Sequence, residues 1–264
     1  MRRRGPPLLE FRNVTLLRGG RRVLDGISFS VARGENVAIV GPNGSGKSSL
    51  IKLLTRELYP FVNDGAPSSM RILGRETWDL FALRRRLGIV TLDLQADFAR
   101  DMTGLEAVLS GFFSSVGLWR RNRVTGDMER KASRALERLE SGHLAGRLMT
   151  AMSTGEARRM LIARALVHDP DTLLLDEPTN SLDLRAVREF RAILRRLARS
   201  GTGVILVTHH LEDLFPEVGR AILLREGRIF RDGPVRIVLT DDTLAELFGM
   251  PVRVESARGY YRMA

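Results

Sequence analysis

The stretch GPNGSGKS, residues 41–48, decides the fold of this chain. It fits the pattern G-x-x-x-x-G-K-[ST] and lies between a short apolar run and an amphipathic stretch. We therefore predict a buried strand (Val37–Val40), a glycine-rich loop and a helix (Ser49–Leu58), in that order. In such a loop the backbone N–H groups turn inward around phosphates, and the helix N-terminus adds a favourable dipole. The sequence thus predicts a site for the β- and γ-phosphates of a nucleotide.

Two side chains of this loop contribute chemistry of their own. Lys47 brings a positive charge to the phosphates, and the hydroxyl of Ser48 is suited to ligate Mg²⁺. The residues that we expect to bind the phosphates are Gly41, Pro42, Asn43, Gly44, Ser45, Gly46, Lys47 and Ser48.

Polar residues follow two further apolar runs at the expected ends of buried strands. Asp176 and Glu177 come after Leu173–Leu175, where Asp176 is expected to hold Mg²⁺ through water. We expect Glu177 to orient or deprotonate the water that attacks the γ-phosphate. His209 and His210 follow the strand 204–208, and one of them is expected to sense the γ-phosphate, because this edge of such a sheet faces the ligand.

The remaining pattern alternates between strand and helix. Residues 8–31 read as a β-hairpin around Gly19-Gly20, and later apolar runs with β-branched residues are separated by helical periodicity. This alternation predicts an α/β fold with a mainly parallel sheet covered by helices. Between Leu92 and Thr150 helical spacing replaces the strand pattern, which indicates a helical insertion. The segment after Gly219 predicts a hairpin and a short helix that ends before Gly249.

The composition limits the class of protein. The chain has 264 residues, 44% of them hydrophobic, and no Cys, which fits a cytoplasmic globular protein without disulfides. No apolar run is long enough to span a bilayer, and we expect no secretory signal. The net charge is +11, and because 3 of the 42 basic residues are Lys, 39 are Arg. We interpret this excess as a compositional Arg bias rather than as a nucleic-acid or lipid surface.

The segment MSTGE, residues 152–156, starts a helix in an unusual way. Ser153 and Glu156 form the pattern of a capping box, in which each side chain accepts a hydrogen bond from the backbone N–H of the other residue. We expect Arg158 and Arg159 to offset the charge of Glu156. The capping box requires no ligand, but a helix start with exposed N–H groups is also suited to an anion.

Four motifs in this order, GPNGSGKSS, STGEARRMLIARAL, LLLDEPTNSLD and ILVTHH, resemble the ATP-binding subunit of ATP-binding cassette (ABC) transporters. The similarity covers about Leu8 to Val252. It implies a P-loop NTPase fold of the ABC ATPase type, with a mainly parallel core, an antiparallel β subdomain and a helical subdomain. The implied domain is 8–252, with the helical subdomain at about 93–150, a basic N-terminal tail at 1–7 and a C-terminal tail at 253–264.

The resemblance also implies roles for individual residues. Asp176 takes the metal-binding role, Glu177 is catalytic, and His209 is the switch histidine. Ser49 joins the ATP site, and Ser181 and Asp183 belong to the D-loop. The resemblance further implies a head-to-tail homodimer, in which each ATP lies between the phosphate loop of one subunit and the signature segment of the other. The signature segment is Met152–Glu156, and its expected ATP-binding residues are Ser153, Thr154, Gly155 and Glu156.

The chain departs from the family pattern at three places. Arg18 lies where the family has an aromatic residue on adenine, so it either stacks there or is solvated. Leu92 replaces the glutamine that reaches Mg²⁺, and we expect Gln95, or else Asp93, to serve instead. In the signature segment Thr154 replaces a glycine, which is costly if the position needs a positive φ, and Glu156 brings a negative charge.

The resemblance implies an ATPase subunit that binds ATP and Mg²⁺, dimerises and drives a separate membrane permease. The chain looks importer-like, loosely of the metal-chelate or molybdate type, and is expected on the cytoplasmic face of the cell membrane as a peripheral protein. Nucleic acid is not expected as a partner. Two alternatives stay open: a soluble regulatory or nucleic-acid-associated ABC ATPase, and a binding-only cassette with weakened turnover.

Overall fold

The computed structural model describes residues 5–61, 67–98, 101–119 and 121–264, and at positions 92, 95 and 96 it describes the backbone alone. The chain divides into two compact units, and each is described by itself. The first unit contains residues 1–80 and 203–264, and the second contains residues 81–202.

The first unit begins with the predicted hairpin. Strands β1 (Leu9–Arg18) and β2 (Arg21–Val31) pair in antiparallel orientation, and β4 (Ser69–Ile72) pairs with the other side of β1. The turn residues Gly19 and Gly20 have φ of 56° and 73°, and the two-residue turn that matches the twist of a hairpin needs such positive values. The prediction of this hairpin is confirmed.

A second group of strands in this unit carries the phosphate loop. Strand β3 (Val37–Val40) lies between β7 (Gly203–Thr208) and β8 (Arg220–Arg225) and is parallel to both, while β9 (Arg228–Pro234) is antiparallel to β8. All four residues of β3 are buried, as its apolar sequence predicts. Strands β8 and β9 also confirm the hairpin that was predicted after Gly219.

The helix after the loop differs in its bounds from the prediction of Ser49–Leu58. Helix α1 runs from Lys47 to Leu54, so it begins two residues earlier and ends four residues earlier. The early end has a local cause, because Arg56 has a φ of 61° and the N–H groups of Glu57 and Leu58 both donate to the carbonyl of Lys52. A left-handed residue of this kind stops an α-helix.

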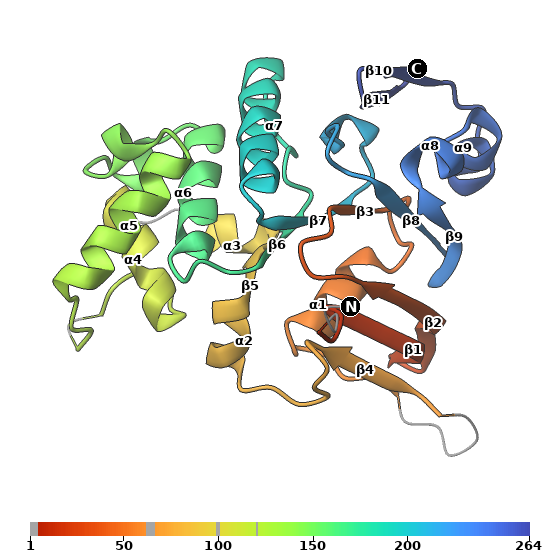
Figure 1. Cartoon of the computed structure of the whole chain (residues 1–264), viewed down its shortest axis with the longest axis horizontal. Coiled ribbons are helices and arrows are strands. Elements are labelled where there is room, and N and C mark those ends of the chain that lie inside the picture. The colour runs from red at the N-terminus through yellow and green to blue at the C-terminus, as the bar shows by residue number, and fades with distance from the viewer. Residues whose placement is uncertain (1–4, 62–66, 99–100, 120) are drawn as a thin grey trace. The chain divides into compact units, whose positions relative to one another are not determined.

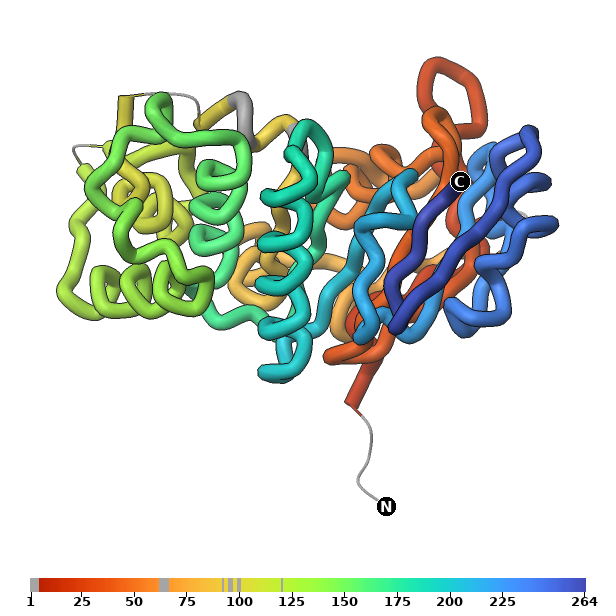
Figure 2. Tube along the Cα trace, turned by 90° about the horizontal axis from the view of Figure 1, so that it is seen from above, coloured from red at the N-terminus to blue at the C-terminus, as the bar shows by residue number. Residues whose placement is uncertain are grey.

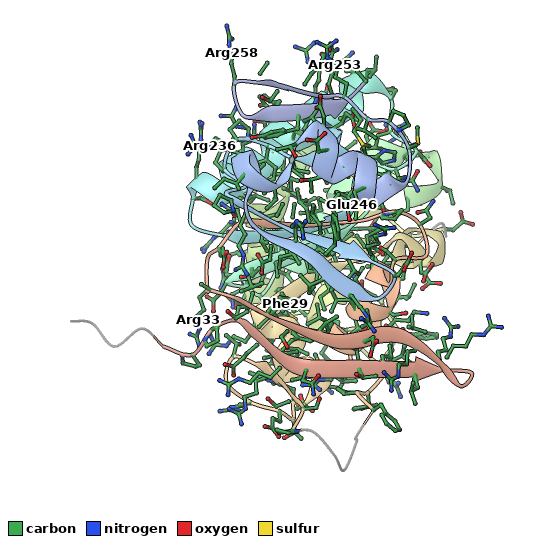
Figure 3. The ribbon with its side chains drawn as sticks, turned by 90° about the vertical axis from the view of Figure 1, so that its right-hand side faces the viewer. Phe29, Arg33, Arg236, Glu246, Arg253 and Arg258 are labelled. Carbon is green, nitrogen blue, oxygen red and sulfur yellow. The ribbon has the colours of Figure 1, made fainter. Side chains whose placement is uncertain are left out.

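The last part of the chain contains short helices and a hairpin. After the short helices η4 (Leu211–Asp213) and α8 (Val235–Val238), helix α9 (Asp241–Phe248) ends at Gly249, as predicted. Strands β10 (Val254–Ala257) and β11 (Tyr260–Met263) then form a hairpin, which Figure 2 shows in dark blue as two strands side by side. In Figure 3 the side chain of Arg258 projects outward from the tip of this hairpin.

The second unit is mostly helical around a parallel strand pair, β5 (Leu87–Val90) and β6 (Thr172–Asp176). Figure 1 shows α4, α5 and α6 grouped together, and the expected helical segment 93–150 falls inside this unit. Its helices are α2 (Leu80–Arg86), α3 (Leu92–Asp97), α4 (Gly104–Leu109), η1 (Ser110–Phe113), α5 (Gly126–Arg138), η2 (Gly142–Leu144), η3 (Met149–Ala151), α6 (Thr154–Leu166) and α7 (Leu184–Arg199).

Helices α6 and α7 give this unit its core. Helix α6 is buried along most of its length, and Arg164 near its end donates to the hydroxyl of Ser110 (3.2 Å) and to the carbonyl of Ser115 (3.1 Å). Burial lowers the pKa of Arg164 to about 10, so the side chain is still charged at neutral pH. The 3–4 spacing of apolar residues in α7 predicts one buried face, and its members are buried apart from the half-buried Val187: Phe190, Ile193, Leu194 and Leu197. Among the helices that the structure describes, none has both the length and the apolar character needed to cross a membrane.

Candidate functional site

The phosphate loop is shaped by glycines that have a positive φ, close neighbours, or both. Gly44 and Gly46 have φ of 80° and 107°, and Gly46 is the N-cap of α1. A Cβ added to Gly41 would lie 2.2 Å from the carbonyl oxygen of Leu224, and one added to Gly46 would lie 2.8 Å from Leu24 Cδ2. The loop therefore needs both the conformational freedom and the small size of glycine.

Two polar side chains of the loop, those of Ser45 and Lys47, are buried. Lys47 is 6% exposed, and its Nζ donates to the carbonyl oxygens of Gly41 (2.7 Å) and Pro42 (3.0 Å). Ser45 Oγ is buried and has no hydrogen-bond partner within the part of the chain that the structure describes. Ser48 is exposed, whereas Ser49 is buried. A buried hydroxyl without a partner is costly, so Ser45 is suited to donate to an anion in the loop.

The turn of the β8–β9 hairpin is hydrogen-bonded to the phosphate loop. Gly227 N–H donates to the carbonyl of Ser45, and the carbonyl of Gly227 accepts from the N–H of Asp25, both at 2.9 Å. A Cβ on Gly227 would lie 2.4 Å from the carbonyl oxygen of Val23. Sequence reasoning predicted this hairpin but not its contact with the loop, because nothing local to Glu226-Gly227 indicates which backbone it meets.

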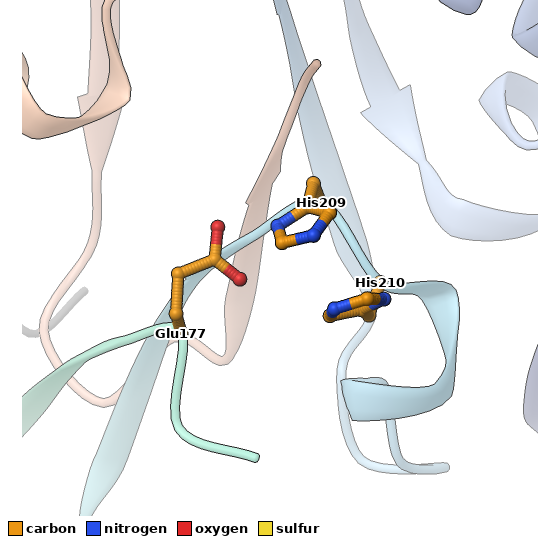
Figure 4. A group of neighbouring side chains, drawn as sticks. All are labelled: Glu177, His209 and His210. Carbon is orange, nitrogen blue, oxygen red and sulfur yellow. The ribbon is translucent and has the colours of Figure 1, made fainter. Parts of the chain in front are cut away.

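The end of β7 lies beside the start of the phosphate loop. The N–H of Gly41 donates to the carbonyl of Thr208 at 3.3 Å, one residue before His209. The Thr208 hydroxyl donates to the buried carboxylate of Asp213 and accepts from the N–H of His210 at 3.0 Å. The rings of His209 and His210 are half-buried with centroids 3.8 Å apart, and Figure 4 shows them next to each other after β7. This buried network fixes the backbone that carries both histidines.

The residues expected to contact adenine and to complete the Mg²⁺ site are Arg18 and either Gln95 or Asp93. Arg18 is the last residue of β1, pairs with Arg21 across the hairpin and is exposed. The backbone of Gln95 lies in α3, but its side chain is outside the described part of the structure, and Asp93 is exposed.

In the second unit, the acidic pair ends strand β6. Asp176 is half-buried, and Glu177, which is drawn in Figure 4, is 7% exposed and has a left-handed backbone with φ of 44°. Arg158 of α6 is only 2% exposed and donates to the carbonyl oxygens of Glu177 (3.2 Å) and Pro178 (3.3 Å). Arg158 therefore holds the backbone on which the Glu177 side chain is mounted, a role that sequence reasoning missed.

The expected D-loop residues lie between β6 and α7. Ser181 is exposed with φ of 64°, and Asp183 is the N-cap of α7, where its carboxylate accepts from the N–H of Ala186 at 2.7 Å. A Cβ on Gly155 would lie 3.3 Å from Ala186 Cβ, so glycine allows the start of α6 to pack closely against the start of α7.

The capping box of the signature segment is confirmed. The N–H of Ser153 donates to Glu156 Oε2 (2.8 Å), and the N–H of Glu156 donates to Ser153 Oγ (3.3 Å). Thr154 is the first residue of α6 and has a helical backbone with a negative φ. The cost of placing a side chain at a positive φ therefore does not arise at this position. Gly155 is half-buried on the same turn.

The charge of Glu156 is offset mainly by a residue that was not expected, and only in smaller part by Arg159, one of the two expected residues. Arg147 pairs with Glu156 Oε1 at 3.0 Å, while Arg159 pairs with Glu189 of α7 at 3.2 Å. The N–H of Ser153 holds the pKa of Glu156 below its usual value, with smaller contributions from the Ser153 hydroxyl and from the charges of Arg147 and Arg159. The sequence did not indicate Arg147, because it lies in the loop before α6 and only the fold places it next to Glu156.

Comparisons with known proteins identify the family of this chain. A family model described as ABC transporter matches residues 24–180. An uncharacterized ABC transporter ATP-binding protein, YlmA of Bacillus subtilis, is 33% identical over 94% of this chain and 93% of its own length. The hemin import ATP-binding protein HmuV of Nocardia farcinica is 36% identical over 95% of this chain and 86% of its own.

A solved structure extends the comparison to a nucleotide-bound state. The dimeric post-hydrolysis structure of the ATP-binding cassette MJ0796, bound to ADP and Pi, has a TM-score of 0.68 and 26% identity over 86% of this chain and 99% of its own. The fold and the relatives together bear out the α/β ABC ATPase fold that the motifs indicate. The chain belongs to the ABC transporter family, as an ATP-binding subunit that hydrolyses ATP.

Proposed function

We propose that two copies of this chain bind MgATP between the phosphate loop of one copy and the signature segment of the other, and that hydrolysis drives a separate permease. The observation that carries the proposal is the phosphate loop with its buried Lys47 and with the buried hydroxyl of Ser45, which has no partner among the described residues. Both groups are suited to bind phosphate oxygens. Lys47 would give up its hydrogen bonds to the carbonyl oxygens of Gly41 and Pro42 and donate to the phosphate instead.

The donor set fits Mg²⁺. Ser48 offers an exposed hydroxyl and Asp176 a half-buried carboxylate, and hard oxygen ligands of this type are the ones that Mg²⁺ prefers. Gln95, or Asp93 in its place, completes the proposed set. When bound, Mg²⁺ would offset the charge that develops on the phosphates.

The reacting groups come from the two strand ends. Glu177 orients or deprotonates the attacking water, and the nearly complete burial of this residue suits a group that works on a single water. His209 senses the γ-phosphate, held by the network around Thr208. Arg18 stacks on adenine through its planar guanidinium, and Ser181 and Asp183 line the contact between the copies.

The partner is a permease for import. The hemin import protein of Nocardia farcinica covers nearly the whole chain, and this likeness supports a substrate of the metal-chelate class. The subunit then acts at the cytoplasmic face of the cell membrane, as a peripheral protein held by its permease.

The test is recovery from membranes. The tagged chain, expressed in its native host, is captured from detergent-solubilised membranes, and a multi-span permease is expected with it. The ATPase activity of the captured complex should fall at least tenfold in Glu177→Gln. A chain that is recovered without any membrane protein, and whose ATPase rises with RNA or DNA in a salt-dependent way, would contradict the proposal. A captured complex without turnover would remove the hydrolytic role alone.

A further inference from the structure

We propose that Arg147 is a positioning residue, which neutralises Glu156 and so allows the signature segment to approach the γ-phosphate held by a second copy. The inference rests on the proposed function, because it requires the signature segment to meet a nucleotide. It concerns a residue outside all four motifs, in the loop between η2 and η3.

The contacts of Arg147 place a positive charge on one specific carboxylate. Its Nη1 lies 3.0 Å from Glu156 Oε1, and its Nη2 donates to the carbonyl of Ala151, just before the signature segment. The second oxygen of Glu156 accepts from the N–H of Ser153 at 2.8 Å. Both carboxylate oxygens are thus engaged, one by the helix start and one by Arg147.

The charge of Glu156 opposes the proposed ligand. The start of α6 offers N–H groups and the Ser153 hydroxyl to an anion, but a carboxylate on the same turn repels a phosphate. The ion pair with Arg147 cancels that charge. Arg159 is a weaker substitute, because it pairs with Glu189, which also binds Arg185 at 2.9 Å.

The pair is not explained by helix stability alone. A capping box works with glutamine as well as glutamate, because the side-chain oxygen of either accepts from the N-cap N–H. The side chains of Arg147 and Glu156 are 46% and 20% exposed, and ion pairs of such exposure contribute little to folding. Control of the charge at the signature segment accounts for both the glutamate and its arginine.

This leads to a test by charge removal. Four full-length proteins are compared: wild type, Arg147→Ala, Glu156→Gln and the double variant. Dimerisation is measured by sedimentation against the concentration of a non-hydrolysable ATP analogue with Mg²⁺. Arg147→Ala should raise the half-saturating concentration by roughly tenfold, since it leaves an unpaired carboxylate beside the phosphate. In the Glu156→Gln background there is no carboxylate left to neutralise, so the double variant should have the same half-saturating concentration as Glu156→Gln within about twofold.

The outcomes separate the inference from its premise. If wild type dimerises and Arg147→Ala still raises the half-saturating concentration about tenfold in the Glu156→Gln background, Arg147 acts through its bond to Ala151 and the inference is wrong. If wild type shows no analogue-dependent dimer, the proposed function itself fails. Arg147→Lys should keep most of the affinity for the nucleotide-bound dimer. The defect of Arg147→Ala should shrink at 0.5 M salt, because salt at about this concentration screens charges over a few ångströms. If Arg147→Ala does not fold, Arg147→Gln replaces it in the same comparison.

Discussion

The phosphate loop and the signature segment, which we propose to bind the same nucleotide from two copies, both lie at the start of a helix but are built differently. The loop at 41–48 is held by backbone conformation, with left-handed glycines and close backbone contacts that leave no room for a Cβ at Gly41. The signature segment at 152–156 is held by side chains, through the capping box and the ion pair with Arg147. The first region is therefore intolerant of substitution, whereas the second is adjustable through charge.

The largest effect is expected from the cation of the loop. Lys47→Ala should lower the ATPase rate by roughly 100-fold, because it removes the charged donor that is expected to stabilise the transferring phosphate. The change is measured as kcat/KM for ATP. The matched control is Lys52→Ala on the last turn of the same helix, which should lie within about twofold of wild type. Equal losses in both variants would show that the helix, not the cation, matters.

Two glycines of the loop separate close contact from backbone strain. Gly41→Ala should lower the free energy of unfolding by about 3 kcal/mol, because its Cβ would lie 2.2 Å from the carbonyl oxygen of Leu224. Gly44→Ala should cost only about 1 kcal/mol, since its φ is 80° but an added Cβ meets no atom within 4 Å in the described part of the chain. Urea denaturation measures both, and a reversed order would contradict the account of the loop.

A smaller effect on rate is expected from Arg158. Arg158→Gln should lower kcat by about tenfold with a smaller change in KM, because it releases the carbonyl oxygens of Glu177 and Pro178 and so misplaces the Glu177 side chain. Arg159→Gln, one position on and paired with Glu189, is the control and should change kcat by less than about twofold. A rise in KM alone would indicate a role in binding rather than in positioning.

The contrast between the two regions also explains what could be read from the sequence. The strand, loop and helix around Lys47, the first hairpin and the capping box are set by neighbouring residues, so local pattern was sufficient. Gly227, Arg158 and Arg147 act through partners that only the fold brings near, and no local signal marks them. The hairpin at 254–263 was missed because its strands have four residues each and no fully buried face.

The smallest expected effect is the acid response of the signature segment. The pKa of Glu156 is lowered in the folded chain, so the ionised carboxylate stabilises the fold above its ordinary pKa near 4.5, and this contribution is lost as pH falls through the lowered value. The free energy of unfolding, measured by urea denaturation at pH 7, should thus be about 0.5 kcal/mol higher for wild type than for Glu156→Gln. The difference is small because the ion pair with Arg147 is partly exposed. The difference should shrink as the pH falls below 4.5 and vanish once Glu156 is protonated in the folded chain as well. A difference that grows in acid would contradict this sign.

The proposal that the two regions meet across a dimer is tested most directly by cross-linking. The natural chain contains no Cys, so Asn43→Cys in the loop and Thr154→Cys in the signature segment can be introduced into separate copies. The two proteins are mixed and treated with a short bis-maleimide, with and without MgATP analogue. The account predicts a covalent heterodimer that forms only with the nucleotide. A cross-link of equal yield without nucleotide, or none at all, would contradict it.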